Sequence, residues 1–310
     1  MSDRGPAQRR SHAGSILLLL GLALLWGYNW VVLKVGVQDA GPVAFAAVRM
    51  LGGAAILVAV LLATRRSFRI VEPWTVAAIG LFQTTGAQGL IAFALRTGEA
   101  GKSAILNYTL PVWVMLLGFV FLKERPRAGQ WMATIVAILG IGTMAFLGGK
   151  PGSLEPVLYA LGASLCWGVG VVINQALMRR HPGEIDTVTL TTWQMVIGSA
   201  LLGLGALVVP EAPIQWTTGF ILAVLYNVGP ATAVAFLIWF TLQRRIEANT
   251  LSLIVLIVPL VGVAAGSIQL GERPSPTDMI GMALILAAIA LMVLTAPKQA
   301  PAVIAIPQEE

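Results

Sequence analysis

Aromatic and amide side chains recur on one face of an apolar stretch near the amino terminus. Trp26, Asn29 and Trp30 are spaced i, i+3 and i+4, so a helix would place all three on one face. A later apolar stretch carries Trp167 and Asn174 on a comparable face. Rings beside amides can bind a small ligand that is partly apolar and partly polar. Packing between helices is the alternative use of the same side chains.

Further neutral polar groups are expected near the middle of other apolar stretches. They are Gln83, Gln88, Asn107, Tyr108, Tyr226, Asn227 and Trp239. Together they predict a binding site lined by neutral donors, acceptors and rings. Such a lining suits a zwitterion or a neutral metabolite better than a phosphorylated ligand, because phosphate calls for basic groups. Each amide could instead hydrogen-bond a neighbouring helix.

Arg49 is the one formally charged side chain well inside an apolar stretch. It could bind a substrate carboxylate, or it could hold its own helix to another. The two histidines, His12 and His181, lie outside these stretches, and there is no His-Glu-x-x-His motif. The single cysteine, Cys166, excludes an internal disulfide and a cysteine metal cluster. The sequence therefore predicts no enzyme, no metal site and no cofactor.

The composition is that of a membrane protein. Hydrophobic residues make up 57% of the 310 residues, charged residues make up 11%, and the mean hydropathy is +0.83. Ten apolar runs are long enough to cross a hydrocarbon core about 30 Å thick as helices. The predicted spans are 14–37, 41–63, 73–95, 102–122, 128–147, 155–177, 187–209, 216–242, 249–270 and 277–295.

Basic residues orient these spans. An inside amino terminus puts fourteen Lys and Arg residues on the cytoplasmic side and five outside, so both termini should be cytoplasmic. We expect a cytoplasmic tail over 1–13, a linker loop over 148–154 and a disordered tail over 296–310. This topology accounts for the net charge of +6, so no nucleic-acid partner is expected.

The chain contains an internal repeat. Pro111 precedes Glu124 by thirteen residues, Pro259 precedes Glu272 by thirteen, and Glu-Arg-Pro follows each time. Other short matches keep the same order, which predicts two copies over 14–147 and 155–295. With five spans each, the copies should have opposite orientations in the membrane. Inverted repeats recur in secondary transporters, with the site near the bilayer midplane.

The prolines predict hinges. Pro111 and Pro259 lie near mid-membrane, and each frees the carbonyl four residues earlier, those of Asn107 and Val255. We expect a water-lined cavity or a polar substrate to satisfy these carbonyls, with a neighbouring helix as the alternative. A further hinge is expected at Gly229 and Pro230.

Carboxylates are expected only at the ends of spans or outside them. Because a proton relay normally uses a carboxylate at mid-depth, we expect facilitated movement down a gradient, or coupling by a route that the sequence hides. Glu124 with Arg125, and Glu272 with Arg273, should cap and neutralise helix ends, with gating contacts as the alternative.

With these features the chain resembles the drug/metabolite transporter superfamily. Within that superfamily it is most similar to the EamA-type exporters, and among those to bacterial exporters of amino acids, particularly aromatic ones. The resemblance rests on ten spans as two copies, a Trp-Gly in the first helix of each copy, Arg49 in the second helix, and Pro with Glu-Arg-Pro across the fourth. It covers residues 14–295, although Gln194 stands where Arg49 would repeat.

The resemblance implies a multi-pass protein of the bacterial inner membrane. Such a protein would export amino acids, including aromatic and other neutral ones, or related small metabolites, by alternating access through a central cavity between the copies. It would act as a monomer among membrane lipids. A polyspecific drug or metabolite efflux carrier of the same fold is the alternative.

Overall fold

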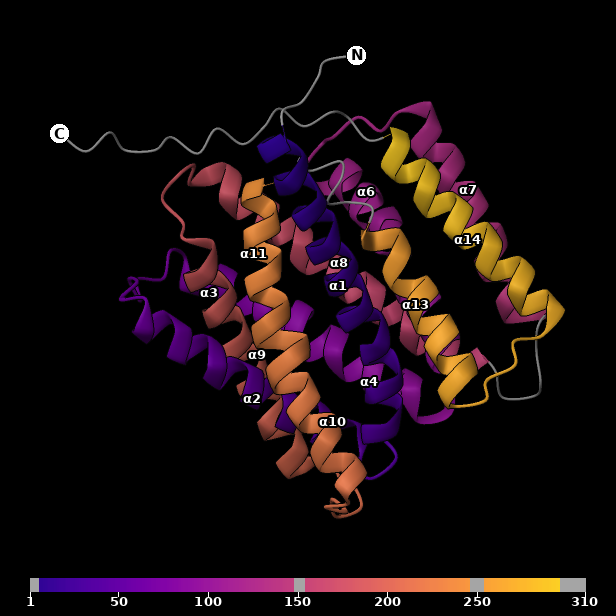
Figure 1. The fold of residues 1–310 in the computed structure, drawn as a ribbon, viewed down its shortest axis with the longest axis horizontal. Coiled ribbons are helices and arrows are strands. Elements are labelled where there is room, and N and C mark those ends of the chain that lie inside the picture. The colour runs from indigo at the N-terminus through magenta and orange to yellow at the C-terminus, as the bar shows by residue number, and fades with distance from the viewer. Residues whose placement is uncertain (1–5, 148–153, 246–253, 296–310) are drawn as a thin grey trace.

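A computed structural model describes residues 6–147, 154–245 and 254–295, which form a bundle of helices without any strand (Figure 1). The elements of the first half are α1 (Pro6–Gly36), α2 (Pro42–Ala63), α3 (Pro73–Ile79), η1 (Gly80–Gly86), α4 (Ala87–Thr97), α5 (Ala100–Asn107), α6 (Leu110–Phe121), α7 (Ala128–Gly142) and η2 (Thr143–Leu147). Those of the second half are α8 (Leu154–Arg180), α9 (Thr187–Val208), α10 (Thr218–Val228), η3 (Gly229–Val234), α11 (Ala235–Arg245), α13 (Ile254–Gln269) and α14 (Pro276–Thr295). The η elements are π-helical turns.

Hydropathy predicted the spans well. Within the described ranges, nine helical segments are long and apolar enough to cross a membrane. The remaining predicted span, 249–270, begins among residues outside the described ranges, and its later part is α13. Residues 6–13 of the predicted cytoplasmic tail are helical and continuous with α1, while the apolar span itself begins at Gly14, so the tail over 1–13 stays a prediction. Residues 1–5, 148–153 and 296–310 lie outside the described ranges.

Several spans are not uniform α-helices. The spans over 73–97 and 218–245 pass through π-helical turns, η1 and η3, part-way along their length. The span over 100–121 is divided at Tyr108 and Thr109 into α5 and α6. A π-helical turn or a break leaves backbone groups outside the regular ladder and often marks a functional position.

The packing pairs elements of the two halves. α2 packs on α9, and α7 lies along α14 at the right edge of Figure 1. α1 packs on α10 and α13, while α8 packs on α4 and α6. The first span of each half therefore contacts both the third and the fourth span of the other half. A two-fold relation between the halves would give this exchange of partners.

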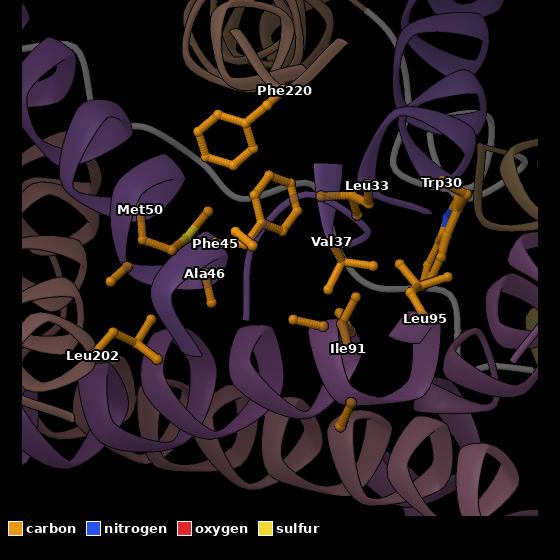
Figure 2. Close-up of a cluster of buried hydrophobic side chains, with 14 of the residues drawn as sticks. Trp30, Leu33, Val37, Phe45, Ala46, Met50, Ile91, Leu95, Leu202 and Phe220 are labelled. Carbon is orange, nitrogen blue, oxygen red and sulfur yellow. The ribbon is translucent and has the colours of Figure 1, made fainter. Parts of the chain in front are cut away.

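The largest buried cluster joins both halves (Figure 2). Phe45 of α2 packs against Phe220 of α10 with ring centroids 6.0 Å apart, and Trp30 of α1 and Leu202 of α9 belong to the same cluster. All four side chains are less than a tenth exposed. Burial in this cluster fixes α1, α2 and α4 against α9 and α10, and so positions the polar residues of α1 described below.

The two Glu-Arg-Pro motifs fold alike. The amides of Leu122 and Glu124 both donate to Gly118 O, and those of Leu270 and Glu272 both donate to Gly266 O. The residue before each glutamate has a positive φ, +56° at Lys123 and +67° at Gly271. In Figure 1 the α6–α7 connection lies at the upper end of the bundle and the α13–α14 connection at the lower end. We call these the Glu124 end and the Glu272 end.

α9 and η1 approach so closely that only glycine fits between them. A Cβ on Gly198 would lie 2.5 Å from Gly80 O, and a Cβ on Gly80 would lie 2.5 Å from Gln194 O. Both neighbours are backbone atoms, which cannot move aside without shifting a helix. Small residues allow this kind of contact between helices in a membrane.

We predict that Gly198→Val destabilises the protein by about 3 kcal/mol, the upper end of the range for overpacking, because the helices must separate. Gly142→Val is the matched control, since a Cβ at Gly142 meets no atom within 4 Å, and its effect should stay within about 0.5 kcal/mol. The measurement is thermal unfolding in detergent, followed by size-exclusion chromatography. Equal stability of the two variants would contradict the close contact.

Candidate functional site

Tyr108, at the break between α5 and α6, and three predicted tryptophans belong to or pack against shared hydrophobic clusters. Tyr108 packs against three separate hydrophobic clusters, one of which contains Trp30. Trp26 and Trp239 pack against another of the three. The rings of Trp26 and Trp239 lie 5.6 Å apart at centroid, and Trp26 Nε1 donates to Ala231 O at 3.2 Å. The structure therefore brings aromatic residues of α1 and α11 together, against a cluster on which Tyr108 also packs.

Three of the predicted site asparagines each have a buried side-chain oxygen without a hydrogen-bond partner among the described residues. The Oδ1 atoms of Asn29, Asn107 and Asn174 are shielded from solvent and accept no hydrogen bond from any described residue. They come from α1, α5 and α8, and thus from both halves. Asn107 is the most buried of the three, at 6% exposed. A buried polar atom without a partner costs free energy, so a ligand that donates hydrogen bonds would relieve it.

The remaining predicted residues have mostly structural contacts. The Gln83 side chain lies against Gly170, where a Cβ would come within 2.6 Å of it. Asn227 Nδ2 donates to Ala223 O, and Tyr226 Oη donates to Leu25 O, each at 2.9 Å. Trp167 is half-buried in α8. Their part in binding stays a prediction.

The carbonyl freed by Pro111 finds a partner in the other half. Pro111 lies in the first turn of α6, and Ser164 Oγ of α8 donates to Asn107 O at 2.9 Å. Thr109 Oγ1 lies 3.2 Å from the same hydroxyl and donates to Leu106 O at 2.7 Å. A neighbouring helix, rather than cavity water or substrate, therefore satisfies this carbonyl, and the expectation drawn from the sequence was wrong on this point.

The other predicted hinges lie within helical structure. Pro259 is an internal proline of α13, while Gly229 and Pro230 begin η3. The hydroxyl of Thr232 donates to Asn227 O at 2.7 Å, bridging the change from α10 to η3. The side chain of Val255 is not among those that the structure describes. Bending at these positions stays a prediction.

Arg49 is bound by a residue of its own half. It is 3% exposed, and its Nη2 donates to Gln88 Oε1 at 2.9 Å and to Gln88 O at 3.2 Å. Its guanidinium also lies 5.7 Å from the centroid of the Phe45 ring. These contacts hold α2 to α4, so the geometry favours the structural role of Arg49 over carboxylate binding.

We predict a non-additive double-mutant cycle for Arg49 and Gln88. Gln88→Leu should cost about 2–3 kcal/mol, because it leaves a buried guanidinium without its side-chain acceptor. Adding Arg49→Met should recover more than about 1 kcal/mol of that loss, because the uncompensated charge is then removed. The measurement is thermal unfolding of the purified variants in detergent. Additive losses would contradict the structural role.

An apolar cavity, open to the surface of the bundle, is lined by none of the three asparagines. It has a volume of about 730 Å³ and is lined by α1, α10, α11 and α13. Of the predicted site residues, Tyr226 lines it, together with Tyr28 and aliphatic side chains. The Tyr28 hydroxyl donates to Gln269 Oε1 at 2.8 Å, and the two tyrosine rings meet edge to face. This cavity offers contact to an apolar group.

Ion pairs join the halves at the Glu124 end. Glu124 pairs with Arg179, and Glu72 accepts hydrogen bonds from Arg180, from Thr75 and from the ring of His181, depending on its tautomer. The bonds from Arg180, then those from Thr75 and His181, lower the pKa of Glu72 to about 2. Glu72 is therefore ionised at every physiological pH, so its ion pair with Arg180 persists.

Sequence reasoning missed several polar contacts that position the site. Ser164 lies three residues before Trp167 and is a polar residue within an apolar run. Its polarity there was the signal that could have identified it as a hydrogen-bonding residue. Gln194 Oε1 and Trp113 Nε1 are also buried without a described partner. Gln194 was visible as the counterpart of Arg49, whereas nothing in the sequence distinguished Trp113 from a packing residue.

A family model matches the chain twice. The model of the EamA-like transporter family matches residues 13–146 and again residues 154–294. The chain belongs to the EamA-like transporter family. It is therefore a multi-pass membrane transporter and not an enzyme.

Relatives of similar length support the same assignment. The chain is 26% identical to "Uncharacterized transporter YoaV" of Bacillus subtilis (strain 168), over 90% of this chain and 97% of that protein. It is 27% identical to a "Probable amino-acid metabolite efflux pump" of Salmonella typhimurium, over 88% of this chain and 92% of that protein. A protein of the same description in Escherichia coli (strain K12) is 26% identical, over 89% and 93%.

A solved crystal structure shares the fold. It superimposes with a TM-score of 0.62 at 19% sequence identity, and the match covers 91% of this chain and 98% of the other. The likeness at this identity shows the fold alone.

Proposed function

We propose that this EamA-like transporter exports amino acids, including aromatic and other neutral ones, or related small metabolites. The observation that carries the proposal is the set of unpartnered Oδ1 atoms of Asn29, Asn107 and Asn174 on helices of both halves. Each atom can accept a hydrogen bond from an ammonium group, and the nearby tryptophans suit an apolar side chain. The relatives described as amino-acid metabolite efflux pumps support the same substrate class.

The free asparagine oxygens favour recognition of the substrate through its amino group. Arg49, the buried cation of α2, donates to Gln88 through Nη2, while its Nε is one buried donor without a described partner against the three asparagine acceptors. The asparagine oxygens are acceptors, so the ammonium group of an amino acid fits them better than its carboxylate does. The transporter should therefore tolerate a blocked carboxylate better than a blocked amine.

Alternating access between two inverted halves is the mechanism that we propose. The exchange of packing partners between the halves supports a two-fold relation. The α6–α7 and α13–α14 connections lie at opposite ends of the bundle, which supports opposite orientations (Figure 1). Such a carrier would expose the site between the halves to each side of the bacterial inner membrane in turn.

A polyspecific efflux carrier is the second candidate, and the apolar cavity favours it. The cavity of about 730 Å³ between α1, α11 and α13 could take a hydrophobic compound. Its two tyrosine hydroxyls already donate to protein acceptors, so it offers little to the polar part of an amino acid.

Uptake into proteoliposomes tests the two candidates. We expect purified protein to transport radiolabelled neutral and aromatic amino acids, with competition by amino-acid esters and little by N-acetyl amino acids. Uptake with and without a pH gradient would show whether protons are coupled. Competition by hydrophobic cations alone would contradict amino-acid export and favour the polyspecific carrier.

Asn107 gives the sharpest prediction for the site. Asn107→Ala should raise the KM for the best amino acid about tenfold, the effect expected from losing about 1.4 kcal/mol of interaction with a charged donor. Thr134→Ala is the matched control, because Thr134 is also buried but its hydroxyl bonds Gln130 O within α7. Liposome uptake measures both, and an unchanged KM for Asn107→Ala would remove this residue from the site.

A further inference from the structure

The start of α5 is held by a carboxylate from the other half. Glu272 Oε1 lies 2.5 Å from the amide nitrogen of Ala100, and Glu272 Oε2 lies 3.0 Å from that of Gly101. These amides belong to the first turn of α5 and have no partner within their own helix. A carboxylate at a helix start accepts such bonds and also balances the helix dipole.

The turn after α13 aims this carboxylate. α13 ends at Gln269, and Gly271 takes a φ of +67° that turns the chain back. Gly266 leaves room for the carboxylate, because a Cβ there would come within 2.4 Å of Glu272 Oε2. The carboxylate therefore lies over the end of its own helix and reaches the start of α5.

Two further contacts reinforce the Glu272 end. Lys102 Nζ pairs with Asp278 Oδ1 at 2.6 Å, and both side chains are nearly buried, at 12% and 9% exposed. Glu211 accepts hydrogen bonds from the amides of Val43 at 3.0 Å and Ala44 at 2.9 Å, in the first turn of α2. Carboxylates of the second half thus hold two helices of the first half at this end.

Among the residues that the structure describes, the Glu124 end is joined by ion pairs between side chains. There the described contacts between the halves include the ion pairs of Glu124 with Arg179 and of Glu72 with Arg180, whose side chains are 32% to 55% exposed. Exposed ion pairs contribute little to stability, because water and salt screen them and flexible side chains must be ordered. Bonds from shielded backbone amides to a carboxylate are stronger.

We propose that Glu272 is a latch that holds the Glu272 end of the bundle closed. Glu124, in the same motif at the other end, pairs with the Arg179 side chain. The inference rests on the proposed alternating access, since a carrier of that kind must open and close each end. The latch opens when the carboxylate leaves the amides of Ala100 and Gly101 and becomes hydrated.

A single reporter cysteine tests the latch without any substrate. Ser103 lies in α5 within a turn of the latch and is 2% exposed. Ser103→Cys is placed in a Cys166→Ser background, and its reaction with a polar maleimide is timed in detergent. Because this readout is independent of transport, it separates failure of the latch from failure of the proposed function.

Glu272→Ala should speed the labelling of the Ser103→Cys reporter about tenfold, because the closed end loses both amide bonds. Glu124→Ala is the matched control, since it removes the same residue from the same motif at the other end, and it should change the rate less than twofold. No acceleration in Glu272→Ala, or equal acceleration in both variants, would overturn the proposal.

Glu272→Gln keeps the test decisive if the alanine variant does not give a monodisperse protein. Glutamine keeps the shape and one oxygen, so it can retain one of the two amide bonds. Labelling should then rise about threefold, and an unchanged rate would overturn the proposal.

Discussion

Backbone polar groups cannot remain unpaired in a bilayer, and the short helix α5 shows what this constraint requires. α5 spans only Ala100–Asn107, so both of its ends lie within the protein. Glu272 accepts from the amides at its start, and Ser164 donates to the carbonyl of Asn107 at its end. Both partners belong to the second half. α5 is therefore held at each end by the half to which it does not belong.

This arrangement connects the latch to the candidate site. Tyr108 follows α5 directly and packs against three hydrophobic clusters, and the free oxygen of Asn107 lies in the last turn of the same helix. Under the proposed function, a change at either end of α5 moves the residues that meet the substrate. Opening of the Glu272 end and release of the ligand would then share one rigid element of eight residues.

The sequence predicted the features that depend on residues close together in the chain. The hydrocarbon core requires long apolar helices, so the described spans followed from hydropathy, and the resemblance indicated the family. Pro111 marked the divided helix because proline cannot donate to the helical ladder. Partners distant in the chain left no such pattern. The bonds from Ser164 to Asn107 and from Ala100 to Glu272 join residues 57 and 172 positions apart, so the carbonyl was wrongly assigned to a cavity.

The opposite orientation of the halves is the central claim, and labelling from one side of the membrane tests it most directly. Arg125 and Arg273 follow the two motif glutamates, and both are exposed. Each would be replaced by cysteine in a Cys166→Ser background and labelled with an impermeant maleimide in intact cells. The account predicts that one of the two cysteines reacts in intact cells, and that the other reacts only after the membrane is opened. Reaction of both cysteines from the same side would contradict it.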